Sequence, residues 1–218
     1  MPTTGSGRQA ICRHDRFVGE LSFCMDTRID NDIETPTSTI QLDAWGRRHI
    51  PGFLGVFASD QLPDIQRVGQ GCLVANYDPA HKPGTHWIGM CFYDGTGYYF
   101  DSYGFGPDMD DRLVHDQTHF GEYLRRFSET QPVINAVDLQ GQHSDVCGEW
   151  SLLYGWAASR GHRYVNRDDP FWGKVLSITD ADARDRMVNR LIRDPKALSG
   201  MLEPEPSVQH TKRKRVQF

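Results

Sequence analysis

One stretch of the chain, residues 140–150, brings together residue types that suit nucleophilic chemistry. It is polar up to Cys147, and beyond it apolar residues recur at the i, i+3, i+4, i+7 spacing of a buried helix face: Trp150, Leu153, Tyr154 and Ala157. We therefore expect a loop that delivers Cys147 to the first turn of a helix. The partial positive charge and free N–H groups of a helix N-terminus stabilise a thiolate, so Cys147 is a candidate nucleophile. Its position alone also fits an inert, buried cysteine.

A β-hairpin is the clearest secondary-structure signal in the chain. Two apolar runs, residues 86–93 and 98–101, flank residues 94–97, whose sequence is Asp-Gly-Thr-Gly. An Asp-Gly pair between apolar runs is typical of a two-residue type I′ turn, because both central positions need positive φ. We therefore expect two antiparallel strands that turn at Asp94 and Gly95, with a four-residue loop as the alternative.

This hairpin predicts that a histidine and a carboxylate lie side by side. With the two-residue turn, Asp101 is the diagonal neighbour of His86 on one face, roughly 7–8 Å away by backbone and within side-chain reach. The longer loop would move Asp101 out of reach. A cysteine nucleophile needs a base, and the base needs a group that orients it, so His86 and Asp101 fit these two roles. His143 is the rival base, being closest in sequence to Cys147, but its loop offers no orienting partner.

Acyl transfer also requires hydrogen-bond donors for the oxyanion. The backbone N–H of Cys147 and one side-chain amide before it would suffice. Both Gln140 and Gln142 are available in the preceding loop. Spacing alone does not choose between them.

The rest of the chain supplies the elements that position these residues. Caps, periodicity and turn residues predict the following elements. Helices are expected at about 38–48, 120–127, 147–160 and 180–193, and strands at about 71–77, 86–93, 98–101 and 133–139. This mixture predicts an α+β fold, with helices packed on a central mixed or antiparallel sheet.

Length and composition favour one domain with polar ends. We divide the 218 residues into a polar N-terminal extension (1–36), one folded domain (37–199) and a flexible basic tail (200–218). No apolar run reaches the roughly 18–20 residues that a membrane span needs, and no signal-peptide pattern opens the chain, so no membrane partner is expected.

The cysteines and charges indicate a reducing intracellular setting. Five cysteines are an odd number without secretory context, which favours free thiols over a disulfide framework. Cys12, His14 and Cys24 lack the four closely spaced ligands of a structural zinc site, so we expect no metal and no cofactor. The basic run at 212–215 suits nuclear import or loose phosphate contact, while the acidic remainder argues against a dedicated nucleic-acid reader.

The order histidine, acid, cysteine differs from that of papain-type enzymes, in which the cysteine comes first. With this order, the chain resembles the adenovirus-type maturation cysteine proteases (adenain-like) and, more distantly, the SUMO/ubiquitin-like-protein proteases of the same fold. The resemblance spans about residues 37–160. It rests on His86-Trp87, on Tyr-Phe-Asp-Ser-Tyr-Gly-Phe-Gly at 99–106, and on Gln140-Gly141 through Ser144 to Cys147-Gly148, with Phe-Leu-Gly-Val-Phe at 53–57 upstream.

The resemblance implies a role for each matching residue. His86 matches the catalytic histidine and Cys147 the nucleophile, and Asp101 takes the place of the acidic third member. Gln140, seven residues before the cysteine, matches the oxyanion glutamine of the adenovirus-type enzymes better than Gln142 does.

The resemblance also implies a binding surface. Trp87 is expected to pack beside the histidine, and we expect Trp87, Gly148 and Gln142 to contribute to substrate binding. Residues 37–199 would then form a cysteine protease domain.

The chain departs from the adenovirus pattern in two ways, one in the candidate triad and one in the cysteine that would bind an activating peptide. The third member is aspartate, as in the SUMO-protease branch, where the adenovirus enzymes carry glutamate. No cysteine lies between Cys91 and Cys147, where the adenovirus enzyme joins its activating peptide. The sequence therefore offers no support for an activating peptide held by a disulfide, or for DNA as a cofactor.

The implied function is that of a cysteine endopeptidase. It would cleave viral capsid or core precursor proteins after small residues such as glycine, in the host nucleus or the virion. One alternative is a deconjugating protease that acts on the tails of ubiquitin-like modifiers. An alternative from another class is a non-catalytic module that only binds glycine-containing peptides.

Overall fold

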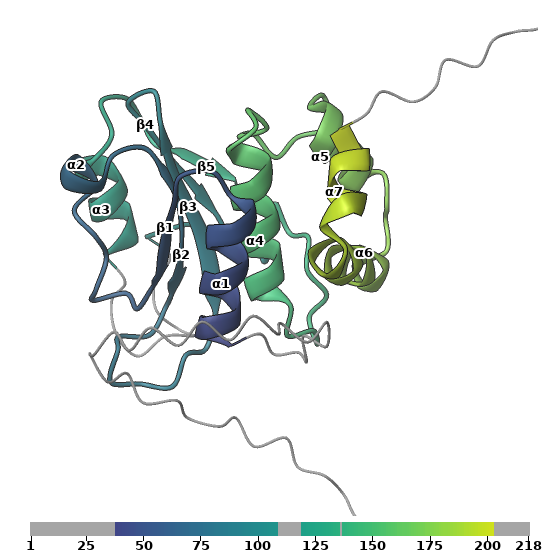
Figure 1. Cartoon of the computed structure of the whole chain (residues 1–218), viewed down its shortest axis with the longest axis horizontal. Helices are drawn as coiled ribbons and strands as arrows, with labels where there is room; N and C mark the ends of the chain where they lie inside the picture. Colours follow the sequence, from purple (N-terminus) through teal and green to yellow (C-terminus); the bar gives the residue numbers. More distant parts are fainter. Residues whose placement is uncertain (1–37, 109–118, 136, 203–218) are drawn as a thin grey trace, which may run out of the picture.

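The computed structural model describes residues 38–108, 119–135 and 137–202. Its strands form one five-stranded sheet in the order β1-β2-β3-β4-β5 (Figure 1). The two outer pairs, β1 with β2 and β4 with β5, are parallel, and the two central pairs are antiparallel. The strands are β1 Phe53–Phe57, β2 Gly71–Asn76, β3 Trp87–Tyr93, β4 Thr96–Phe100 and β5 Val133–Asn135. The predicted α+β fold with a mixed sheet is confirmed.

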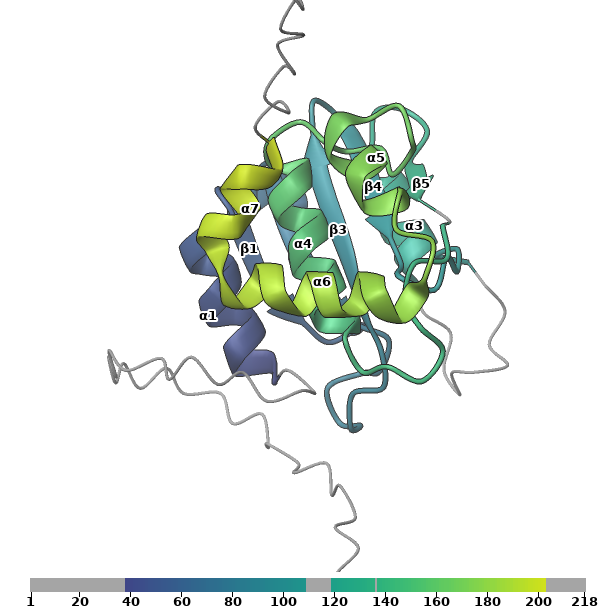
Figure 2. The same ribbon diagram turned by 90° about the vertical axis from the view of Figure 1, so that its right-hand side faces the viewer.

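Helices cover both faces of this sheet. In the described part of the chain they are α1 Thr39–His49, α2 Ile65–Val68, α3 Phe120–Arg126, α4 Cys147–Ala158, α5 Pro170–Leu176, α6 Ala181–Arg193 and α7 Pro195–Leu202. Figure 1 shows α2 and α3 on one face and α1 and α4 on the other. Helices α5, α6 and α7 form a further layer outside α4 (Figures 1 and 2).

The predicted extension (1–36) lies outside the described residues. So do Cys12, His14, Cys24 and the basic run at 212–215. Within the described part, α7 extends to Leu202 and so crosses the boundary expected at residue 200.

The β3–β4 hairpin has the two-residue turn that its sequence predicts. Tyr93 pairs with Thr96, and the two residues between them, Asp94 and Gly95, have φ values of 52° and 70°. Positive φ at both positions is the geometry of a type I′ turn. The expected pairing is therefore confirmed, and it sets which residues leave the open end of the hairpin together.

Helix α4 is buried on every side rather than along one stripe. All its residues from Gly148 to Ala158 are buried, because α4 packs against the sheet, against α1 beside it and against α6 outside it (Figures 1 and 2). A Cβ atom at Gly89 of β3 would lie 3.1 Å from Cδ1 of Tyr154, so glycine there lets α4 approach the strand closely. The central helix thus carries its first residue, Cys147, on a rigid support.

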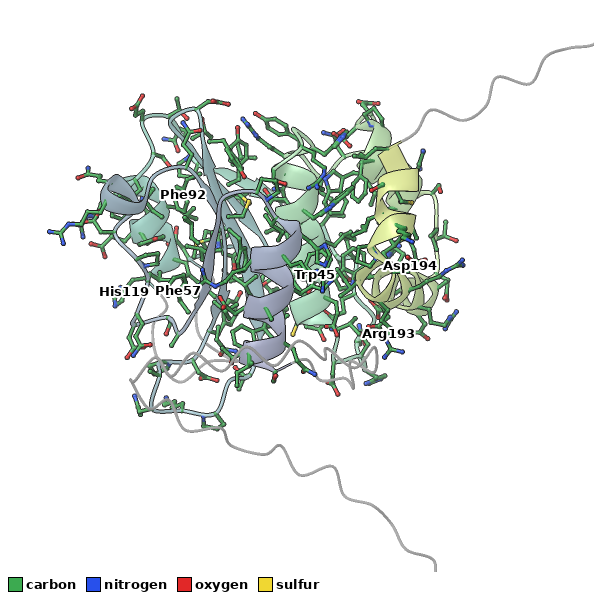
Figure 3. All side chains as sticks on the ribbon, viewed as in Figure 1. Trp45, Phe57, Phe92, His119, Arg193 and Asp194 are labelled. Atoms are coloured by element: carbon green, nitrogen blue, oxygen red, sulfur yellow. A yellow bond between two sulfur atoms is a disulfide. The ribbon has the colours of Figure 1, made fainter. Side chains whose placement is uncertain are left out.

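The outer helical layer is tied to the inner one by a buried tryptophan. Trp45 extends from α1 toward the outer layer, where its Nε1–H donates to the carbonyl oxygen of Ile192 on α6 at 2.8 Å (Figure 3). A buried indole N–H needs such a partner, because leaving it unpaired would cost about 1–3 kcal/mol. The bond joins the start of the domain to its end.

Three helices of the described residues were not predicted: the short α2, and α5 and α7, which both begin at an Asp-Pro pair. Asp169-Pro170 reads as a turn, yet Asp169 caps α5 by accepting from the N–H groups of Phe171 and Trp172. Asp194-Pro195 likewise precedes α7. Aspartate followed by proline is a signal both for a turn and for a helix start, and only the apolar residues behind it distinguish the two.

A disulfide joins Cys72 of β2 to Cys91 of β3, which corrects the expectation that these cysteines are free thiols. The two residues are 19 positions apart in the chain but lie directly opposite each other in the β2–β3 register. The sequence predicts the two strands without predicting that register, so it does not place the two sulfur atoms together.

The side chain of Asn135, at the end of β5, holds the edge of the sheet through hydrogen bonds, and their contribution to stability can be tested. Its Oδ1 accepts from the N–H of Val165 at 2.8 Å, and its Nδ2 donates to the Tyr99 carbonyl and the Tyr154 hydroxyl, both at 3.1 Å. Asn135→Ala should lower the free energy of unfolding by about 2–3 kcal/mol, because it leaves buried polar groups unpaired. Urea denaturation measures the change.

The matched control is Asn166→Ala. The Asn166 side chain is exposed and accepts only from the nearby N–H groups of Asp168 and Asp169. Its loss should cost under about 1 kcal/mol. Equal losses in the two variants would contradict the role given to Asn135.

Candidate active site

The structure brings His86, Asp101 and Cys147 together. His86 directly precedes β3, Asp101 directly follows β4, and Cys147 opens α4. The open end of the hairpin therefore meets the N-terminus of the central helix. Nε2 of His86 lies 3.1 Å from Oδ2 of Asp101, and the Cys147 side chain is close enough to the same imidazole to raise its pKa.

The contact between His86 and Asp101 has the geometry of an ion pair. The two atoms are close, but Nε2 forms no aligned hydrogen bond. Both groups are withdrawn from water, with the His86 side chain 11% exposed and that of Asp101 fully buried. At this depth a charge–charge contact is screened much less than at the surface.

The electrostatics favour a protonated histidine. Burial by itself lowers the pKa of His86, but its interactions with Asp101 and Cys147 outweigh burial and raise the pKa to about 9. An imidazole beside both a carboxylate and a cysteine is an arrangement that nucleophilic catalysis by cysteine can use.

Asp101 is held by partners other than the histidine. The Tyr77 O–H donates to Oδ2 at 2.6 Å, and the N–H of Tyr103 donates to Oδ1 at 2.8 Å. The Tyr99 hydroxyl lies 3.0 Å from that of Tyr77 and extends the network. A buried carboxylate needs such donors, because a charge without them is very costly to bury.

Tyr77 is a residue of the site that the sequence analysis missed. Its N–H donates to the carbonyl of His86 at 3.0 Å, and its ring meets the imidazole edge-on at 5.1 Å between centroids. Burial and the charge of Asp101 raise the pKa of Tyr77, so the phenol stays protonated and donates. The signal was its place at the end of the strand predicted at 71–77, and Tyr77 reaches His86 only through the β2–β3 register.

The two candidate glutamines have different environments. Gln140 is buried: its Oε1 accepts from Ser102 Oγ at 2.7 Å, and its Nε2 donates to the Ser144 carbonyl at 2.6 Å and the Tyr103 hydroxyl at 3.2 Å. Gln142 is exposed on the loop. Of the two, Gln140 has the amide whose orientation the fold determines.

The remaining predicted site residues surround the start of α4. Trp87 is half-buried at the start of β3. A Cβ atom at Gly148 would lie 2.9 Å from Cδ2 of Leu42 and 3.4 Å from Cδ1 of Trp87, so glycine lets the first turn of α4 sit against both. The rival base, His143, is exposed on the loop.

The described ranges contain neither a candidate metal cluster nor a candidate membrane-spanning helix. No group of three or more histidine, cysteine, aspartate or glutamate residues in them could hold a metal ion. None of the helices described has both the length and the apolar character needed to cross a membrane.

Comparison with known proteins does not assign a family. No protein-family model matches the chain, and no curated protein matches its sequence. The chemistry is therefore inferred from the geometry of the site.

The pKa of His86 provides a test of the contact with Asp101. Asp101→Asn should lower that pKa by about 1–3 pH units, because it removes the neighbouring negative charge. NMR titration of the His86 imidazole in both proteins measures the difference. An unchanged pKa would show that Asp101 does not act on the histidine.

The same contact makes stability depend on pH. The folded-state pKa of about 9 lies above the ordinary value of 6.5, so the contribution of His86 to stability is present below pH 6.5 and is lost as pH rises toward 9. The free energy of unfolding should therefore fall across this window, and less steeply in Asp101→Asn. Urea denaturation at several pH values compares the two slopes.

Proposed function

We propose that the protein is a cysteine peptidase. The observation that carries this proposal is that one imidazole, His86, contacts a buried carboxylate and the cysteine at the start of α4. A nucleophile, a base and an orienting acid in mutual contact are the arrangement that covalent acyl transfer requires.

Each of these residues would carry out one part of peptide hydrolysis. The Cys147 sulfur attacks the scissile carbonyl, and His86, having taken the thiol proton, gives it to the leaving amine. Asp101 orients the imidazole and stabilises its charge. A water molecule deprotonated by His86 then attacks the thioester, which releases the acid product and restores the thiol.

The oxyanion would be held by two donors. One is the backbone N–H of Cys147, since the first N–H groups of a helix have no partner within it. The other is Nε2 of Gln140, a buried residue in the loop that leads to the cysteine. Such donors act strongly in a site that excludes water.

The resemblance to the adenovirus-type proteases supports a narrower proposal. Substrates would be extended peptides cut after a small residue such as glycine, within viral capsid or core precursors in the host nucleus or the virion. Comparing cleavage of a capsid-type glycine peptide with cleavage of a ubiquitin-like fusion tests this proposal. Preference for the fusion would favour a deconjugating enzyme instead.

Cys147→Ala should abolish peptide hydrolysis with the fold intact, because no other group forms the thioester. The check is a fluorogenic glycine-containing peptide, with circular dichroism as the control for folding. Iodoacetamide should label Cys147 ahead of Cys72 and Cys91, which are buried and joined to each other. Hydrolysis that survives Cys147→Ala would refute the mechanism, and peptide binding without thiol reactivity would favour a non-catalytic module.

Gln140→Ala should lower kcat by on the order of 10²–10³ if its amide holds the oxyanion. Gln142→Ala is the matched control, because this exposed glutamine lies in the same loop and should leave kcat nearly unchanged. Steady-state kinetics on one peptide compares them. A larger loss in Gln142→Ala would reverse the assignment.

A further inference from the structure

A buried aspartate on α6 contacts the loop that carries Gln140. Asp185 is 5% exposed. Its Oδ2 accepts from the backbone N–H of Gly141 at 2.9 Å, and its Oδ1 accepts from Nε1–H of Trp150 at 2.8 Å. One carboxylate therefore bonds both to the residue after Gln140 and to α4, one turn beyond Cys147. Figure 2 shows α6 lying across α4.

The residue before Gln140 is held by the same helix. Nε of Arg184 donates to the Leu139 carbonyl at 2.9 Å. On the opposite side, the Gln140 N–H donates to the Ser102 carbonyl at 3.0 Å. The backbone around Gln140 is thus fixed from α6 and from the segment that follows β4.

The loop approaches α6 closely at Gly141. A Cβ atom there would lie 2.7 Å from Oδ1 of Asp182 and 3.0 Å from Oδ2 of Asp185. Both distances are shorter than a normal carbon–oxygen contact. The Gly141 N–H can therefore reach the carboxylate because the residue has no side chain.

We propose that Asp185 is a positioning residue that holds the Gln140 loop at a set distance from Cys147, and so places the Gln140 amide for the oxyanion. This inference rests on the proposed function. Hydrogen bonds to a buried carboxylate are short and strong, so they resist displacement of the loop. Small displacements of an oxyanion donor reduce its contribution, because the donor must lie within about 2.7–3.1 Å of the oxyanion.

Asp185→Asn is the direct test. An amide has one acceptor oxygen and one donor NH₂ group, so asparagine cannot accept from both Gly141 and Trp150. We expect kcat to fall by about 10- to 100-fold with KM little changed. The matched control is Asp182→Asn, which removes the same charge from an exposed position one turn earlier on α6 and should leave kcat unchanged.

Two further measurements separate positioning from general damage. The rate of alkylation of Cys147 by iodoacetamide needs the nucleophile and its base but no oxyanion donor, so it should be unaffected in Asp185→Asn. The kcat of Gln140→Ala should fall no further when Asp185→Asn is added, since both changes remove the same donor. A normal kcat in Asp185→Asn, or additive losses in the double variant, would overturn the inference.

Hydrogen exchange tests the contact even if the variant does not fold. In the wild-type chain the Gly141 amide and the Trp150 indole N–H should both be protected, in contrast to the exposed loop residues Gln142 and His143. Rapid exchange at Gly141 would overturn the inference without touching the proposed function. If the wild-type protein shows no Cys147-dependent hydrolysis, the proposed function is refuted, and the positioning role of Asp185 is refuted with it.

Discussion

The rest of the site depends on the buried carboxylate of Asp101. A charged group without water needs donors around it, and here Tyr77, Tyr103 and His86 surround the two oxygens. Each of these residues comes from a different part of the β2–β3–β4 region, so the carboxylate also sets their spacing. Together with Cys147 it also raises the pKa of His86, which favours the protonated imidazole.

Around this carboxylate the fold provides rigidity on two sides. The sheet supplies His86 and Asp101 from neighbouring strands, and α4 supplies Cys147 from a helix that is buried on every side. The outer layer adds a second connection, because α6 bonds both to α4 and to the Gln140 loop through Asp185. Cys147, His86 and the Gln140 loop are thus held by different layers that pack on one helix.

Several parts of this arrangement follow from local chemistry and were predicted. The Asp-Gly turn fixes the hairpin register because its φ values are positive, and that register brings Asp101 to His86. The start of α4 at Cys147 follows from the periodicity of the apolar residues behind it. The helices after Asp169 and Asp194 were missed, since an Asp-Pro pair also marks a turn.

The sequence by itself thus determined the class of fold, the hairpin with its pairing of His86 and Asp101, and the helix that begins at Cys147, because each depends on residues near one another in the chain. Only the tertiary structure decided that Gln140 is buried while Gln142 is exposed, that Tyr77 bonds to Asp101 and Asp185 to Gly141, and that Cys72 pairs with Cys91. These features depend on strand register and on the packing of α6 against α4. Contacts between residues so far apart in the chain are selected by the burial of the whole core, and no short pattern records them.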